Sequence, residues 1–158
     1  MKFLFASDSF KGTLSSRQTI DLLTQAARDV FGEVSCIGVP VADGGEGTAE
    51  AVVTAEHGSW MEAEVSGPLM EKVTARYGKL DEKRAVIEMA AASGLTLVPM
   101  EKQNPLNTTS YGTGELIRHA LDQGFTDLSI AIGGSATNDG GIGVCPGAGD
   151  PIPGCGRI

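Results

Sequence analysis

The sequence predicts an α/β fold, and three observations support this prediction. Twice within the first 57 residues, a short apolar run is followed by a polar loop and then by residues with helical periodicity. Between residues 61 and 90, apolar residues alternate with charged ones, which is typical of antiparallel strands. A further helical pattern precedes an apolar run that ends directly in a glycine-rich loop. The expected architecture is a Rossmann-like parallel sheet with helices, plus an antiparallel β segment that belongs to a second α/β domain.

The first 60 residues are expected to form the Rossmann-like part. Strands are predicted over 3–7 and 34–41, because both runs are short and apolar. Helices are predicted over 17–31 and 48–57, where apolar residues recur at helical spacing. The expected helix boundaries are Ser15 or Ser16 before the first helix, and Gly32 and Gly58 after the first and second helices.

Residues 61–144 are expected to begin the second α/β domain. The alternating runs in this region are separated by the Gly67-Pro68 turn and by a polar turn over 78–83. This spacing suits an antiparallel meander better than a parallel sheet. The predicted elements are strands over 61–66, 72–77, 84–90 and 128–132, and a helix over 113–123 that ends at Gly124.

Charge and cysteine content predict a cytoplasmic protein without nucleic-acid or membrane partners. The chain carries a net charge of −8 and has a pI near 4.7, so it lacks the basic character that binds nucleic acid or anionic membranes. It has no apolar run of about 18 residues, and the apolar stretch after Met1 is too short for a signal peptide. The three cysteines form no CxxC motif, which favours a reduced compartment.

Three polar loops that contain glycine follow predicted strands, over residues 8–13, 43–48 and 133–141. In open α/β sheets, ligands bind beyond the carboxyl ends of the strands, where such loops gather. Glycine lets backbone N–H groups approach an anion, and Lys11 adds a mobile positive charge. The carboxylates available for Mg²⁺ binding or proton removal are Asp8, Asp43, Glu46 and Asp139. This combination predicts phosphoryl transfer.

Several of these residues also have structural interpretations, which the sequence leaves open. Asp43 and Glu46 could cap the helix that begins near Thr48, and Lys11 could be a solvated side chain. Residues 108–110 could form only an N-cap cluster. Structural roles are expected for His57, His119 and Cys36. The sequence contains neither a Walker A motif nor an HExxH zinc motif.

Two long motifs and five short ones occur in order along the chain. The long motifs are PVADGGEGT at 40–48 and GGSATNDGG at 133–141. The short motifs lie at 8–11, 66–69, 88–95, 108–110 and 112–116. Together they resemble the bacterial glycerate kinase family, at family spacing, from residue 1 to about residue 144. The resemblance implies a cleft between two α/β domains, one of them Rossmann-like.

The resemblance also implies an activity and its partners. Family members use ATP and Mg²⁺ to phosphorylate D-glycerate, generally at the 2-hydroxyl in the bacterial enzymes that this chain resembles. By this resemblance the chain is expected to be a glycerate kinase, a phosphotransferase with an alcohol acceptor, whose ligands are D-glycerate and ATP. The motifs predict no oligomeric state.

The matched loops supply the expected site residues. The expected catalytic residues are Lys11, Asp43 and Asp139, with Asp43 or Asp139 acting as base or metal ligand. The expected substrate- and phosphate-binding residues are Asp8, Ser9, Gly44, Gly45, Glu46, Gly133, Gly134, Ser135, Thr137 and Asn138. The motifs do not fix which carboxylate binds the metal.

The tail, residues 145–158, departs from the family pattern. Seven of its last thirteen residues are Gly or Pro, and no periodicity remains. When residues 146–158 are written as codons with freely chosen third bases, a reading frame shifted by one base gives Gln-Ala-Leu-Gly-Ile-Arg-Phe-Leu-Asp-Ala-Asp-Gly. That string has the helix, strand and turn pattern that the fold requires next. We therefore expect the tail to be a frameshift product, which sequencing of the coding DNA across codons 142–148 tests.

Family members are more than twice as long as this chain, so the sequence predicts a truncated kinase. A parallel sheet without its later strands exposes apolar edges, and we expect the fragment to be inactive alone. The alternative function is a non-catalytic module that retains the anion-binding loops. A structural fragment without any ligand is a more distant third possibility.

Overall fold

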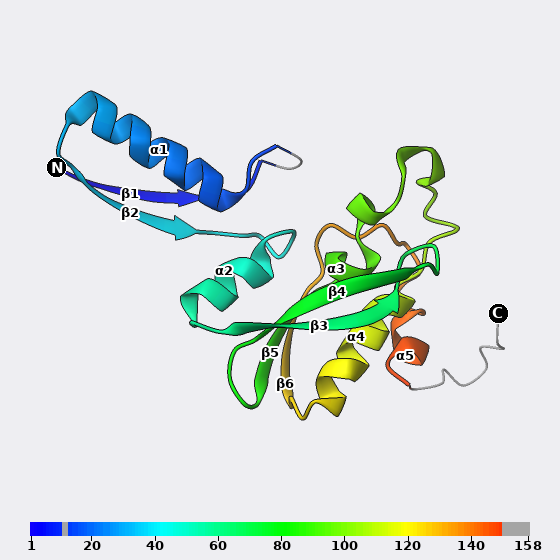
Figure 1. Cartoon of the computed structure of the whole chain (residues 1–158). Helices are drawn as coiled ribbons and strands as arrows, with labels where there is room; N and C mark the ends of the chain where they lie inside the picture. The colour runs from blue at the N-terminus through cyan, green and yellow to red at the C-terminus, as the bar shows by residue number, and fades with distance from the viewer. Residues whose placement is uncertain (11–12, 150–158) are drawn as a thin grey trace.

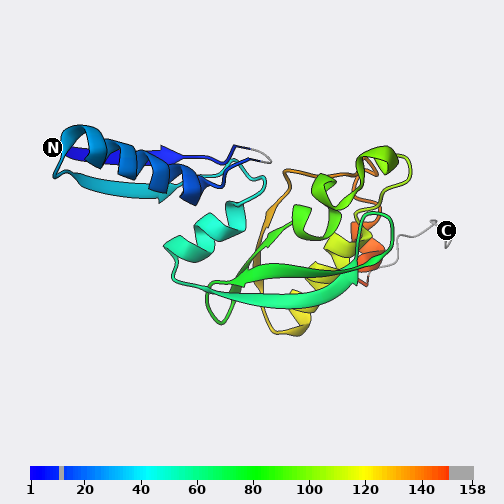
Figure 2. The ribbon, with the colours of Figure 1, turned by 45° about the horizontal axis from the view of Figure 1, so that its top comes forward.

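The computed structural model describes residues 1–10 and 13–149. It begins with a β–α–β unit made of β1 (Lys2–Ser7), α1 (Ser16–Phe31) and β2 (Ser35–Pro40). The two strands are parallel and pair in register from Lys2 with Ser35 to Ser7 with Pro40, and α1 packs on one face of the pair. This unit extends away from the rest of the molecule in both views (Figures 1 and 2).

Local sequence explains both ends of α1. The hydroxyl of Ser15 accepts the N–H of Gln18, and the Gln18 side chain accepts the N–H of Ser15, which completes a capping box. Gly32 ends the helix with a φ of 72°, a backbone conformation that favours glycine. Ile20 and Ala27 are buried on the face of α1 that meets the strands.

The second part is a four-stranded sheet in the order β3-β4-β5-β6. Its strands are β3 (Ser59–Ser66), β4 (Lys72–Lys79), β5 (Arg84–Glu88) and β6 (Asp127–Ala131). The first three are antiparallel neighbours, as the alternating pattern predicts, and β6 adds to β5 in parallel. The predicted fold class, a parallel α/β part followed by an antiparallel β segment, is confirmed.

Two helices cover opposite faces of this sheet. The main core lies between the sheet and α4 (Tyr111–Asp122), while α2 (Thr48–Ala55) packs on β4 and β5 from the other side (Figure 1). The side chains of β5 show the alternation: Ala85 and Ile87 join the α4 core, and Val86 packs against α2. The domain boundary predicted near residue 60 stays a prediction. The helix before it, α2, contacts strands β4 and β5 that follow it.

The strand predicted over 84–90 ends at Glu88, and short helical turns follow it. The chain leaves β5 through α3 (Ala90–Ser93) and two 3₁₀ turns, η1 (Leu95–Leu97) and η2 (Met100–Lys102). After β6 and the glycine-rich loop comes α5 (Val144–Gly147), a single turn that packs on α4. Residues 150–158 of the predicted aberrant tail lie outside the described residues, as do Lys11 and Gly12.

Apolar side chains remain exposed on the β1–α1–β2 unit. Leu4 is 67% exposed and its register partner Ile37 is 54% exposed, because α1 covers only the other face of the two strands. Within residues 1–10 and 13–149, no helix has the length and apolar character needed to cross a bilayer.

Candidate functional site

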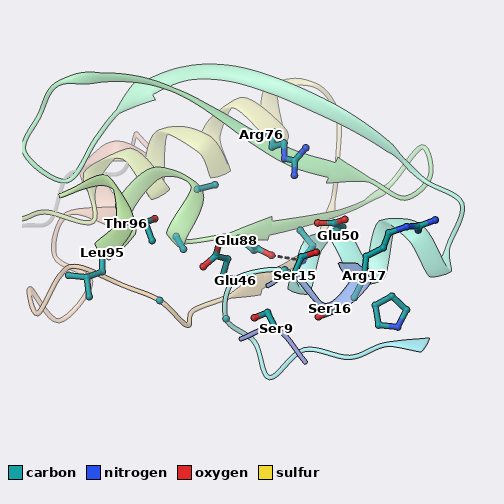
Figure 3. Close-up of a pocket in the computed structure, with 18 of the residues that line it drawn as sticks. Ser9, Ser15, Ser16, Arg17, Glu46, Glu50, Arg76, Glu88, Leu95 and Thr96 are labelled. Carbon is teal, nitrogen blue, oxygen red and sulfur yellow. Dashed lines mark hydrogen bonds between the residues drawn. The ribbon is translucent and has the colours of Figure 1, made fainter. Parts of the chain in front are cut away.

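A cleft of about 920 Å³ opens between the β1–α1–β2 unit and the four-stranded sheet. The first part contributes Ser9 and the start of α1, and the second contributes β4, the end of β5 and the α3–η1 segment. The loop between β2 and α2, together with Gly134, completes the lining. Figure 3 shows Glu46, Glu88 and Arg76 around this cleft, with Ser15, Ser16 and Arg17 on the α1 side.

The two long glycine loops touch each other at the rim of the cleft. The N–H of Gly133 donates to the carbonyl of Gly44 over 2.8 Å. A Cβ added to Gly133 would lie 2.5 Å from the Cα of Gly45, so no larger residue fits at this approach. Residues 43–48 and 133–141, which are far apart in the sequence, therefore form one continuous surface.

The loop before α2 is held by one of its own side chains and by a distant carboxylate. Asp43 Oδ1 accepts a hydrogen bond from the N–H of Gly45 at 3.1 Å. The N-cap residue of α2 is Gly47, and it makes no side-chain hydrogen bond to the helix. Instead, the N–H of Ala49 donates to Glu88 Oε1 at 2.7 Å. The capping role considered for Asp43 and Glu46 is therefore wrong, and Glu88 at the end of β5 fills it.

Glu88 is a site residue that the sequence analysis missed. Partial burial raises the pKa of its carboxyl group, and the nearby charge of Glu46 raises it further. Backbone hydrogen bonds from Ala49 and Gly47 oppose this rise, as does the positive charge of Arg76. The available signal was an acid at the carboxyl end of an apolar strand, directly before a small-residue segment.

Two arginines add positive charge to the cleft, and the sequence analysis missed both. Arg76 comes from β4 and lies over the ring of Trp60, with the guanidinium carbon 4.1 Å from the ring centroid. Arg17 comes from the first turn of α1. Neither arginine takes part in the ion pairs found in the described chain. They provide the cations that an anionic ligand requires.

The 133–141 loop separates the cleft from a smaller hollow of about 240 Å³. Gly134 lines the cleft, whereas Ser135 and Thr137 line the hollow. Ser135 Oγ accepts the N–H of Thr137 at 3.0 Å and lies 2.8 Å from the Thr137 hydroxyl. The loop is also fixed to the chain after α3, because Leu95 N–H donates to the Gly134 carbonyl.

Asp139 fastens the glycine-rich loop to the start of α4. Its Oδ2 accepts the N–H of Ser110 at 2.9 Å and the Ser110 hydroxyl at 2.7 Å. The amides of Gly141 and Gly143 donate to the same carboxylate. Partial burial raises the pKa of Asp139, but these hydrogen bonds outweigh it and the pKa lies below its ordinary value. These contacts hold the glycine-rich loop against the start of α4. The role of base or metal ligand expected for Asp139 stays a prediction.

The other expected residues are distributed around the cleft. Of the sequence-predicted set, Ser9, Gly45, Glu46 and Gly134 line the cleft itself. Asp8 and Asp43 are exposed beside it, and each accepts a hydrogen bond from a nearby backbone N–H. Asn138 is exposed in the 133–141 loop. Lys11 lies outside the described residues.

His119 has the expected structural role, since its Nδ1 lies 3.1 Å from the buried Tyr77 hydroxyl.

The carboxylates of the cleft fit a metal that is bound together with a phosphate ligand. Among the described residues, no three His, Cys, Asp or Glu side chains gather closely enough to hold a metal ion by themselves. Mg²⁺ in phosphoryl-transfer sites is usually held by one or two carboxylates plus substrate phosphates. Glu46, Glu50 and Glu88 are the described carboxylates that line the cleft, and Glu46 lies close enough to Glu88 for its charge to raise the pKa of that carboxyl group.

Known proteins match this chain along nearly all of its length. The model of the Glycerate kinase family matches residues 3–150. A glycerate 2-kinase of Escherichia coli strain K12 is 54% identical over 145 residues, which cover 91% of this chain and 38% of that protein. A glycerate kinase of Bacillus subtilis strain 168 is 52% identical with the same coverage.

A solved structure shares the fold as well as the sequence. The crystal structure of a protein assigned as glycerate kinase 2 from Salmonella typhimurium LT2 superposes with a TM-score of 0.73 at 50% identity. The match covers 93% of this chain and 40% of that one. The chain thus spans about two fifths of the length of the proteins that it matches.

Proposed function

This chain belongs to the glycerate kinase family, and from that premise we propose that it serves the ATP-dependent phosphorylation of D-glycerate. The proposed product is 2-phosphoglycerate, in keeping with the relative named glycerate 2-kinase. The proposed metal is Mg²⁺, which neutralises phosphate charge in reactions of this class.

The contact between the two glycine loops at the cleft is the observation that carries this proposal. Phosphoryl transfer depends on positioning and on electrostatic stabilisation more than on covalent chemistry of the protein. Backbone from both loops meets where Gly133 donates to Gly44, and the adjoining cleft holds acids and arginines together. Such a site can place a polyphosphate beside a small hydroxy acid and hold a metal between them.

Individual roles follow from these positions. Glu46 and Glu88 are the proposed metal-holding carboxylates, and Arg76 and Arg17 are proposed to attract the anionic groups. Asp43 supports the loop that carries Glu46, while Asp139 positions the loop that carries Gly134 and Ser135. Lys11 remains a proposed phosphate-binding residue on the basis of its motif.

Turnover by this chain alone is expected to be weak or absent, because it spans 38% of the length of the relatives named above. A coupled assay of ADP release with D-glycerate and Mg-ATP tests the function. It is run on this chain and on a version in which the reading frame is restored after Val144. We expect turnover only in the restored protein, abolished by chelation of Mg²⁺ and largely lost in its Lys11→Ala variant. Phosphorus NMR of the product then distinguishes 2- from 3-phosphoglycerate.

Each result bears on a separate part of the proposal. A restored protein that releases no ADP with D-glycerate contradicts the proposed substrate. A product phosphorylated at the 3-hydroxyl contradicts only the position of transfer. Full activity in Lys11→Ala removes that residue from the site. Calorimetric binding of D-glycerate or Mg-ATP to the present chain without turnover supports a fragment that retains the binding loops.

A further inference from the structure

The small hollow beside the cleft differs from the cleft in its chemistry. Its walls include Val98, Pro105 and Ala136, and its polar groups come from Asn104, Thr108 and Thr137. None of the described residues that line it is charged, whereas the cleft is lined by two arginines and three glutamates. A carboxylate or phosphate would find no cation in this hollow, but a neutral ligand with apolar faces and hydrogen-bonding edges would fit.

Two side-chain amides at the hollow offer complementary groups. Asn104 accepts the Leu106 N–H through its carbonyl oxygen, which leaves its NH₂ group for a ligand. Gln103 donates its NH₂ to the Val98 carbonyl over 3.2 Å, which leaves its own carbonyl oxygen. Gln103 and Asn104 are neighbours in the chain and both line the hollow, so they offer it one acceptor and one donor. An adenine edge requires this combination, because adenine presents a ring-nitrogen acceptor next to an amino donor.

The hollow and the cleft adjoin across a single peptide unit. Gly134 lines the cleft and the next residue, Ser135, lines the hollow, while Leu95 and Gln103 line both. Gly134 has no side chain and a φ of 72°, so at this position only backbone lies between the two spaces. A ligand can therefore extend from the neutral hollow over Gly134 into the charged cleft.

From these observations we infer that the hollow binds the adenosine part of the phosphoryl donor, with its phosphates reaching over Gly134 into the cleft. This inference rests on the proposed function. At about 240 Å³ the hollow is smaller than a typical site for a whole drug-sized ligand, roughly 300–1,000 Å³, and is therefore suited to the nucleoside rather than to the complete nucleotide.

Calorimetric binding to this chain tests the inference without requiring turnover. The probes are Mg-ATP, inorganic tripolyphosphate with Mg²⁺, and adenosine. We expect ATP to bind more tightly than tripolyphosphate, and adenosine to bind weakly by itself. Asn104→Leu is expected to weaken the binding of ATP and of adenosine by about 3- to 10-fold, the contribution of about one hydrogen bond, and to leave the binding of tripolyphosphate unchanged. Gln103→Leu serves as a second, independent variant.

Asn107→Leu is the matched control. Asn107 is exposed in the same segment and does not line the hollow, so this variant should bind all three probes like the parent chain. Circular dichroism spectra of the variants are compared with that of the parent chain to check that each variant is folded.

The outcomes separate the inference from the proposed function. Equal affinity for ATP and tripolyphosphate, or unchanged ATP affinity in both Asn104→Leu and Gln103→Leu, would overturn the nucleoside site while leaving phosphate binding intact. Absence of adenosine binding at millimolar concentration would also overturn it. Binding of adenosine without binding of tripolyphosphate would keep the hollow as a nucleoside site and count against the kinase role of the cleft.

Discussion

The β1–α1–β2 unit and the four-stranded sheet bury their apolar side chains to very different extents. In the first unit, α1 covers one face of two strands, and Leu4 and Ile37 on the other face are more than half exposed. In the sheet, α4 and α2 cover both faces, and Tyr77, Ile87 and Leu116 have no exposed surface. Because burial of apolar area is the main stabilising term in folding, the sheet should provide most of the stability of the chain.

The two regions also differ in how their polar groups are satisfied. α1 is capped by its own neighbours Ser15 and Gln18, whereas α2 is capped by Glu88, which lies 39 residues after Ala49. The start of α4 is likewise held by Asp139, 29 residues after Ser110. The first unit is thus built from local contacts, and the sheet and its loops are tied together by contacts between distant residues. Four pairs of substitutions test this difference.

The largest effect is expected from truncation of a leucine. Leu116→Ala removes a side chain with no exposure and should lower the free energy of unfolding by about 2–5 kcal/mol. Leu4→Ala, at 67% exposure, should change it by less than about 0.5 kcal/mol. Urea denaturation followed by circular dichroism measures both. Equal losses of unfolding free energy in the two variants would contradict the difference in burial between the two regions.

A smaller effect is expected at two aspartates in the loops after β1 and β6. Asp139→Asn removes an acceptor of several hydrogen bonds and should cost about 2 kcal/mol at pH 7, while Asp8→Asn should be nearly neutral. Because the pKa of folded Asp139 lies below its ordinary value of 3.8, its stabilisation is present above pH 3.8 and is lost as the pH falls through the folded value. The parent and Asp139→Asn should therefore converge in acid. Urea midpoints from pH 3 to 7 test this.

Next in size are the two helix caps. Ser15→Ala and Glu88→Ala should each cost about 1 kcal/mol, because each leaves an N-terminal amide without its acceptor. Burial raises the pKa of Glu88 above its ordinary value of 4.5, so its stabilisation is complete below pH 4.5 and declines as the pH rises through the folded value. The cost of Glu88→Ala should shrink with rising pH. The cost of Ser15→Ala should stay constant, and a parallel pH dependence would contradict the long-range cap.

The smallest effect is expected from the surface pairs on the two helices. Arg118 pairs with Asp122 on α4, and Gln25 donates to Asp29 on α1, each four residues apart. Arg118→Ala and Gln25→Ala should each cost about 0.5 kcal/mol or less. Added salt should reduce the cost only for Arg118→Ala, because only that pair is ionic on both sides. Thermal denaturation at low and high salt measures the difference.

The sequence allowed the regular elements to be predicted because their signals are local. The start of α1 follows from Ser15 and Gln18, and the antiparallel strands follow from alternation along residues 61–79. The glycine loops were also recognisable as candidate ligand-binding segments, since glycine next to acids after a strand is a local pattern. The sequence analysis did not predict α3, η1 or η2, because turns this short have little periodicity.

The sequence by itself determined the α/β class, the positions of most elements and the family, all of which depend on patterns within short stretches of chain. Only the tertiary structure decided that Glu88 caps α2, that Asp139 secures α4 and that Arg76 lies in the cleft. It also decided that one glycine loop lies against the other and that Gly134 and Ser135 line different spaces. The physical reason is that these contacts join residues about 30 to 90 positions apart, and their geometry depends on how the sheet brings separate strands together.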